Sequence, residues 1–183
     1  MPMLERQAKM SRMYANRLPG VLVVLEDMCD PHNAAAILRS CDGLGVGQVC
    51  YLFDRVEPYD PRTLGKCSSA TANQWVDIET TTNRATLEAA LSMDGYTSVA
   101  SVLHDPSAVA LWQHEFRAPK LALWVGNERT GLSPEARAFC DYTLTIPMRG
   151  MVESFNVSVA TALILAEIVR QRRPDGDGTE SPR

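Results

Sequence analysis

Short apolar runs alternate along this chain with longer segments whose apolar positions recur at helical spacing. The short runs are rich in valine, leucine and isoleucine and are apolar on both faces, which is typical of strands in a covered parallel sheet. They predict six strands, at Val21–Leu25, Gln48–Phe53, Trp75–Glu79, Thr97–Leu103, Leu121–Val125 and Tyr142–Ile146. The longer segments predict helices at Met3–Arg17, Pro31–Leu44, Asn83–Met93, Pro134–Phe139 and Asn156–Arg172. This alternation predicts an α/β fold, with a mostly parallel six-stranded sheet and helices on both faces.

Capping residues support two of the predicted helix starts. Asp30-Pro31 and Ser133-Pro134 each place an N-capping side chain before a proline at the first helical position. The length of 183 residues suggests one domain. We expect this domain to occupy residues 1–173 and to begin with a basic helix at 1–18. Residues 174–183 are rich in proline, glycine and acidic side chains and are expected to be a disordered tail.

Composition excludes several classes of protein. The chain is 45% hydrophobic and 22% charged, as ordinary globular domains are. No apolar run reaches the roughly 18 residues that a membrane span needs, and the N-terminus lacks the apolar region of a secretory signal. The five cysteines are scattered without a Cys-x-x-Cys pair, and neither they nor the three histidines have metal-ligand spacing. We therefore expect a cytoplasmic protein with reduced thiols, no metal and no membrane association.

The net charge of −4 argues against a protein that coats nucleic acid nonspecifically. Basic residues nevertheless cluster near the N-terminus and at the end of the last predicted helix. Such clusters fit a local RNA or DNA contact, although solvated helix faces often look the same. The candidates for this contact are Arg6, Lys9, Arg12, Arg170, Arg172 and Arg173.

The first of three segments with chemical potential is DPHNAAAILRSCDGLGV, which begins at Asp30. Asn33 lies beside a helix N-terminus, where anions bind readily. Arg39 shares a helix face with the small side chains Ala35 and Ala36, which leave space above the backbone. Asn33 and Arg39 could hold a phosphate or a ribose, or they could be a capping asparagine and a surface arginine.

The second segment, LALWVGNERTGLSPEA, runs from a buried strand through a polar loop into a capped helix. The loop contains Gly126 and Gly131, and α/β proteins bind ligands at such carboxyl ends of strands. It lacks the Gly-Lys-Ser/Thr ending of a phosphate-binding P-loop. Glu128 in this loop could act as a general base or could pair with a neighbouring arginine such as Arg129 or Arg39.

The third segment, IPMRGMVESFNVSVATALILAE, leads from a strand into an apolar helix. Ser154 and Asn156 stand just before that helix, where each polar group needs a partner. The first helical positions are small, so a chain segment, a partner subunit or a ligand could pack closely there.

Together and in this order, the three segments resemble the motifs of the SPOUT superfamily of RNA methyltransferases, specifically the TrmH-like 2′-O-ribose methyltransferases. The resemblance covers roughly residues 20–173. The first motif is matched by Asn33, Ala35 and Arg39, the second by Gly126, Glu128, Gly131 and Leu132, and the third by Ile146–Met148 and Ser154–Ala160.

The resemblance implies a deep trefoil knot near the C-terminus, a homodimer, and S-adenosylmethionine bound in a bent form against the knot loops. The catalytic set that it implies is Asn33, Arg39, Glu128, Ser154 and Asn156. The cofactor-binding set that it implies is Ser101, Gly126, Asn127, Ile146, Met148 and Phe155.

The implied activity is 2′-O-methylation of RNA, most closely of the D-loop guanosine 18 of tRNA. Methylation of another tRNA position or of ribosomal RNA is an alternative, as is RNA binding without catalysis on the same scaffold. A nucleotide-binding oxidoreductase is disfavoured because the chain has no G-x-G-x-x-G fingerprint. Arg39 either removes the proton of the 2′-hydroxyl or contacts the adjacent phosphate and stabilises the developing alkoxide. The second role suits a guanidinium better, because that group ordinarily stays protonated.

Overall fold

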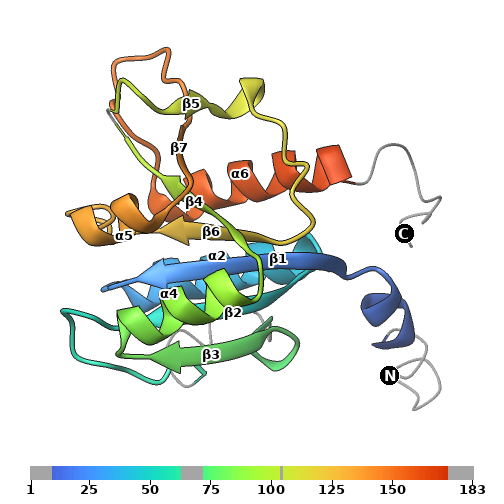
Figure 1. Ribbon diagram of the computed structural model, residues 1–183. Helices are drawn as coiled ribbons and strands as arrows, with labels where there is room; N and C mark the ends of the chain where they lie inside the picture. Colours follow the sequence, from blue (N-terminus) through green and yellow to red (C-terminus); the bar gives the residue numbers. More distant parts are fainter. Residues whose placement is uncertain (1–9, 63–71, 104, 173–183) are drawn as a thin grey trace.

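The computed structural model describes residues 10–62, 72–103 and 105–172 (Figure 1). Within them the chain forms one sheet of seven strands, and every pairing between neighbouring strands is parallel. The strands lie side by side in the order β3-β2-β1-β6-β4-β7-β5. Their bounds are Leu18–Glu26 for β1, Val46–Leu52 for β2, Asp77–Thr81 for β3, Thr97–Ser101 for β4, Val109–Ala110 for β5, Leu121–Val125 for β6 and Tyr142–Thr145 for β7.

Four α-helices and two short 3-10 helices have bounds in the described part of the chain. The α-helices are α2 (Pro31–Gly43), α4 (Arg84–Met93), α5 (Pro134–Phe139) and α6 (Val157–Arg172), and the 3-10 helices are η1 (Ala72–Gln74) and η2 (Leu111–Gln113). Residues 10–15 are also helical and form the described part of the predicted N-terminal helix. No helix in the described ranges combines the length and the apolar character needed to cross a membrane.

The sheet is covered on both faces, as the sequence predicted. On one face, side chains of β1 and β6 such as Val23 and Leu123 pack with α2 and α6. On the other face, Val24 and Trp124 pack with residues of α4 and α5. Successive residues of a strand point to opposite faces, so both sets must be apolar when both faces are covered. This explains why the strands read as unbroken apolar runs.

The predicted α/β class and the parallel sheet are confirmed, but the described part of the chain forms seven strands where six were predicted. The seventh strand, β5, has only two residues, which is too short to leave any periodic signal in the sequence. The strand predicted at Trp75–Glu79 begins at Asp77, because η1 and a turn occupy the preceding residues. The predicted Thr97–Leu103 strand already ends at Ser101.

Burial accounts for the chemistry of two cysteines. Cys41 and Cys50 lie in the core, and burial raises the pKa of each thiol to about 12. A thiol with such a pKa stays protonated and unreactive at neutral pH. These two residues therefore behave as small hydrophobic side chains of the core.

The strand order brings the predicted functional segments to one edge of the sheet. β6 lies between β1 and β4, with Leu25 paired to Val125 and Ala100 paired to Trp124. The chain leaves β1 toward α2 on one face and leaves β6 toward α5 on the other. Ligands of α/β proteins bind at such a switch point, outside the carboxyl ends of the strands.

Candidate active site

The loop after β6 is folded tightly on itself. The backbone N–H of Gly131 donates to the carbonyl of Asn127 at 2.9 Å, and the reverse bond measures 3.2 Å. Gly131 has a φ of +68°, a conformation that glycine adopts without steric cost. Gly126 lies against the same backbone, since a Cβ atom there would come within 2.1 Å of the Gly131 carbonyl carbon and the Leu132 nitrogen. Both glycines are therefore required by the shape of the loop.

Glu128 joins this loop to the start of α2. Its carboxylate accepts hydrogen bonds from the backbone N–H groups of Cys29 at 3.3 Å and Asp30 at 3.2 Å. It also accepts one from the Asn33 side-chain amide at 3.1 Å. None of the arginines in the described ranges forms an ion pair with it. Of the two alternatives left open by the sequence, the arginine pair is thus not observed.

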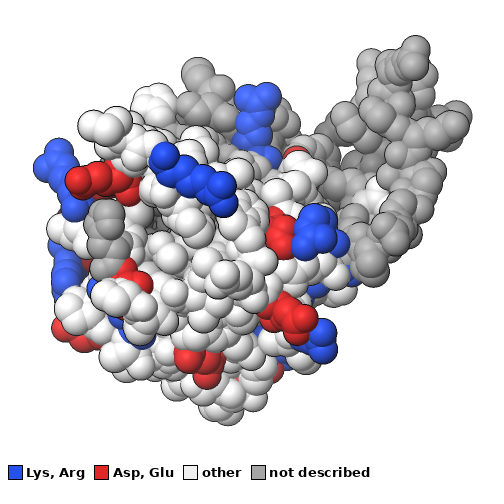
Figure 2. Space-filling model, turned by 90° about the horizontal axis from the view of Figure 1, so that it is seen from above, with Lys and Arg blue, Asp and Glu red and all other residues white. Residues whose placement is uncertain are grey.

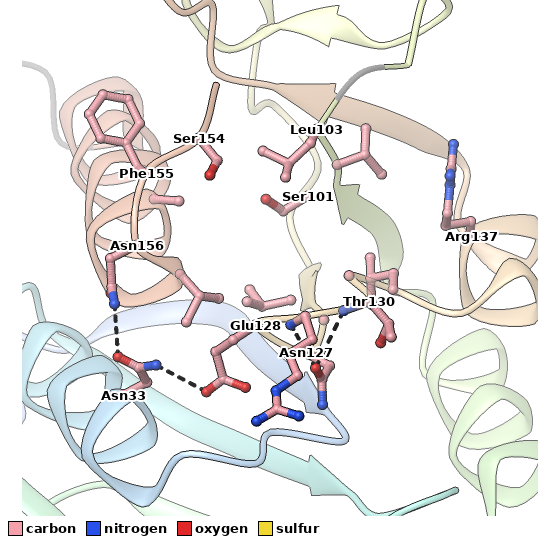
Figure 3. A pocket seen from close by; sticks show the side chains of 18 residues that line it. Asn33, Ser101, Leu103, Asn127, Glu128, Thr130, Arg137, Ser154, Phe155 and Asn156 are labelled. Atoms are coloured by element: carbon pink, nitrogen blue, oxygen red, sulfur yellow. Dashed lines mark hydrogen bonds between the residues drawn. The ribbon is translucent and has the colours of Figure 1, made fainter. Parts of the chain in front are cut away.

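Asn33 and Asn156 extend this contact to the third segment. The Asn33 Oδ1 atom accepts a hydrogen bond of 3.0 Å from the Asn156 side-chain amide. The Asn156 Oδ1 atom caps α6, because it accepts from the Ser158 backbone N–H at 2.8 Å and from the Ser158 hydroxyl at 2.6 Å. Figure 3 shows the resulting line from Glu128 through Asn33 to Asn156. One side chain from each of the three segments takes part in it, although up to 123 residues separate the partners.

A cavity of about 540 Å³ lies beside this line of side chains. Ser101 and Leu103 border it from the end of β4, and Ser154 and Phe155 border it from the segment before α6 (Figure 3). Val102, Val125, Gly126, Asn127, Thr130 and Leu132 also line the cavity. The cavity thus combines apolar walls with a few polar groups, as small-molecule sites do.

The predicted site residues fall into two groups. The cavity lining includes all of the predicted catalytic set except Arg39, and all of the predicted cofactor set except Ile146 and Met148. Ile146 packs against the main core. Arg39 is exposed on α2 and makes no hydrogen bond or ion pair within the described ranges.

Arg137 is a lining residue that the sequence did not suggest. Its guanidinium forms an ion pair of 2.7 Å with Asp105, from the loop between β4 and β5. Hydrogen bonds from Ser107, together with Arg137, lower the pKa of Asp105 to about 2. Arg137 lies in α5, just after the second segment and outside the motif residues themselves, so only the fold brings it to the cavity.

The predicted RNA-binding arginines are only partly available. Arg170 forms an ion pair with Glu167, and its hydrogen bond lowers the pKa of Glu167 to about 2. Arg172 is half-buried and donates to the carbonyls of Phe116 and Ala118, while burial lowers its pKa.

Arg12 is exposed, whereas Arg6, Lys9 and Arg173 lie outside the described residues. On the face seen in Figure 2, basic side chains are spread out and several lie beside acidic ones. No single basic patch therefore stands out on that face.

Comparison with known proteins gives a consistent family. The model of the SpoU rRNA Methylase family matches residues 20–166. The chain is 37% identical over 171 residues to the tRNA (guanosine(18)-2′-O)-methyltransferase of Escherichia coli K12. The alignment covers 93% of this chain and 72% of that enzyme.

Two solved structures extend the likeness to three dimensions. The A. aeolicus TrmH/SpoU tRNA modifying enzyme matches with a TM-score of 0.79 and 30% identity, over 91% of this chain and 83% of the other. The SpoU methyltransferase AviRb from Streptomyces viridochromogenes, in complex with the cofactor AdoMet, matches with a TM-score of 0.70 and 28% identity, over 86% and 58%.

Proposed function

Because this chain belongs to the SpoU rRNA methylase family, it is an S-adenosylmethionine-dependent RNA methyltransferase, and we propose that it methylates the 2′-hydroxyl of guanosine 18 in tRNA. The observation that supports this most directly is the hydrogen-bonded line Glu128–Asn33–Asn156. It joins the three family motifs beside one cavity. The choice of tRNA rests on the names of the relatives, since the family as a whole is named for ribosomal RNA.

The cavity fits the methyl donor. Gly126 lines the cavity without a side chain, and its backbone packs directly against that of Gly131 and Leu132. Val125 and Leu132 border the cavity with apolar side chains that suit an adenine ring, and Ser101 offers a hydroxyl to the ribose, whereas the Asn127 side chain is engaged by hydrogen bonds within the protein. S-adenosylmethionine supplies an electrophilic methyl group on a sulfonium, so the protein need only orient the acceptor and help its proton to leave.

In this proposal the chain's own residues divide that work. Glu128 and Asn33 hold the loop after β6 and the start of α6 at a fixed separation. Ser154 lines the cavity beside Asn156, where its hydroxyl can bind the target ribose. Arg39 stands outside the cavity with its guanidinium free to contact RNA phosphate and to stabilise negative charge developing on the 2′-oxygen. Ile146 and Met148 do not line the cavity, so their assigned role in donor binding stays a prediction.

The trefoil knot is part of the proposal. Residues 146–156 connect β7 to α6, and this connection brings Asn156 to Asn33, which in turn contacts Glu128 of the loop after β6. Helix α6 then packs on α2. Tracing residues 146–156 in an experimental electron-density map tests the threading, and a path outside the loop formed by residues 101–125 contradicts the knot.

We also propose that the protein is a homodimer with α6 in the interface. Large apolar side chains are exposed in the segment before α6 and on the first turn of α6: Met151 is 100% exposed, Val152 64%, Phe155 40% and Val159 45%. Such a patch is unusual for a monomer surface and suits a second copy of the chain.

Val159→Arg should weaken the dimer by roughly 100-fold, because it buries an unpaired charge in the interface. Sedimentation velocity over a range of protein concentrations measures this change. Met93→Arg is the matched control, since Met93 is 88% exposed at the end of α4, away from the patch. A monomeric wild-type protein, or equal dissociation in both variants, contradicts the interface.

The substrate is tested by transfer of labelled methyl groups from S-adenosylmethionine to unmodified tRNA transcripts, followed by mapping of the modified nucleotide. We expect one 2′-O-methyl group, at guanosine 18. A transcript with 2′-deoxyguanosine at that position is the control and should accept none. Methylation of ribosomal RNA fragments alone would keep the chemistry and replace the substrate. No transfer to either RNA would favour an RNA-binding role without catalysis.

A further inference from the structure

A buried ion pair contacts Ser133 at the end of the loop after β6, outside the three motifs. Glu26, the last residue of β1, is only 1% exposed. One of its oxygens lies 2.6 Å from the guanidinium of Arg84, the first residue of α4. The same guanidinium contacts Asp54 at 2.7 Å. Burying a carboxylate costs much free energy unless it is paired and hydrogen-bonded, so this arrangement needs an explanation.

The other partner of Glu26 is Ser133, which follows the cavity wall directly. The Ser133 backbone N–H donates to one Glu26 oxygen at 2.8 Å, and the Ser133 hydroxyl donates to the other at 2.6 Å. The hydroxyl oxygen also accepts from Arg84 at 2.8 Å and from the backbone N–H of Ala136 at 3.1 Å. A serine hydroxyl has one donor and two acceptor positions, and all three are used here.

The loop after β6 is thus held at both its ends. At its start, the Asn127 side chain donates to the carbonyl of Asp27 at 2.6 Å. At its end, Ser133 donates two hydrogen bonds to Glu26, the residue that precedes Asp27 in the chain. Because Gly126–Leu132 form one wall of the cavity, the position of Glu26 determines where that wall stands.

We infer that Glu26, with Arg84 as its counter-ion, is a positioning residue that shapes the methyl-donor site through Ser133. The inference rests on the proposed function, because it assigns the donor to this cavity. An apolar pair of similar size would stabilise the fold as well, but it would leave the Ser133 amide and hydroxyl without a fixed partner. The Glu26 carboxylate accepts a hydrogen bond from each of these two groups.

Glu26→Gln is the direct test, because glutamine keeps the shape of the side chain. Both Glu26 oxygens accept hydrogen bonds from Ser133 or Arg84. In either orientation of the glutamine amide, its NH₂ group therefore faces a donor and one hydrogen bond is lost. We expect the Kd for S-adenosylhomocysteine and the KM for S-adenosylmethionine to rise by about tenfold, as for a lost charged hydrogen bond. The kcat at saturating donor and the KM for tRNA should stay within about twofold, because Glu26 touches neither RNA nor the reacting atoms.

Ile78→Val is the matched control for lost stability. Ile78 is buried in β3, away from the cavity, so its truncation should lower the melting temperature without changing donor affinity. Ser133→Ala and Ser133→Thr form a second pair, in which threonine keeps the hydroxyl. Alanine should weaken binding of S-adenosylhomocysteine by about tenfold, and threonine should restore it.

The outcomes separate this inference from the proposed function. A wild-type protein that fails to bind S-adenosylhomocysteine in calorimetry overturns the donor site itself. If the wild-type protein and Glu26→Gln bind S-adenosylhomocysteine with equal affinity, and only the melting temperature of Glu26→Gln is lowered, then Glu26 stabilises the fold without positioning the donor site. If Glu26→Gln does not fold, the serine pair decides, and equal affinities of its two variants overturn the inference.

Discussion

Gly126→Ala should abolish binding of S-adenosylmethionine and with it all methyl transfer. The added Cβ atom would lie 2.1 Å from two backbone atoms of Gly131 and Leu132. Those atoms belong to the backbone, so the clash cannot be relieved by rotating a side chain. The loop must open, and overpacking of this kind costs about 3 kcal/mol or more. Because donor binding in this proposal requires the closed loop, a cost of this size lowers donor affinity by roughly 100-fold.

Calorimetric titration with S-adenosylhomocysteine measures the affinity, and circular dichroism shows whether the variant is folded. Gly43→Ala is the matched control. Gly43 ends α2, and a Cβ atom there meets nothing within 4 Å, so alanine should be tolerated. A Gly126→Ala protein that binds the ligand normally would show that the loop does not contact the donor.

Much of the fold was predictable because the sheet is buried on both faces. Strands such as β6 leave a strong apolar signal, and the bounds predicted for Leu121–Val125 agree with the structure. The helix Pro134–Phe139 was also predicted correctly, because its N-capping Ser133 and its first residue Pro134 are adjacent in the sequence. The two-residue strand β5 has no local signal and exists only because β7 offers an edge for pairing.

The site was predictable to the extent that its residues sit in the motifs. Asn33, Glu128 and Asn156 were singled out by sequence, but their mutual hydrogen bonds depend on three distant segments meeting at one sheet edge. Arg137 and Glu26 could not be found in this way. Arg137 belongs to a helix outside the motifs, and Glu26 reads as the polar end of an apolar strand. Tertiary structure alone gives these two residues their partners.

Arg39→Ala is expected to lower kcat roughly 1,000-fold while leaving affinity for S-adenosylhomocysteine unchanged. The two parts of this expectation have separate causes. Arg39 does not line the cavity, so donor binding does not depend on it. It is exposed and has no hydrogen bond or ion pair within the described ranges, so its removal disturbs no structural contact. Loss of one preorganised group that stabilises developing negative charge costs about 100- to 1,000-fold in rate.

Single-turnover transfer of labelled methyl groups to tRNA measures the rate, and calorimetry measures donor affinity. Arg117→Ala is the matched control, because that side chain is 82% exposed and its ion pair is with neighbouring Glu115. It should leave kcat unchanged. Weakened donor binding in Arg39→Ala would mean that the arginine supports the cavity and has no direct part in the reaction.

Arg39→Lys separates the two ways in which the arginine can act. A lysine keeps the positive charge but loses the planar fork that binds phosphate through two parallel hydrogen bonds. If Arg39 grips the phosphate beside the target ribose, lysine should restore only a small part of the rate, and the KM for tRNA should rise. If charge near the 2′-oxygen is sufficient, lysine should restore most of the rate with an unchanged KM. We expect the first result, because Arg39 is exposed and does not line the cavity, so in the proposed function its guanidinium is available to an RNA phosphate and does not contact the donor.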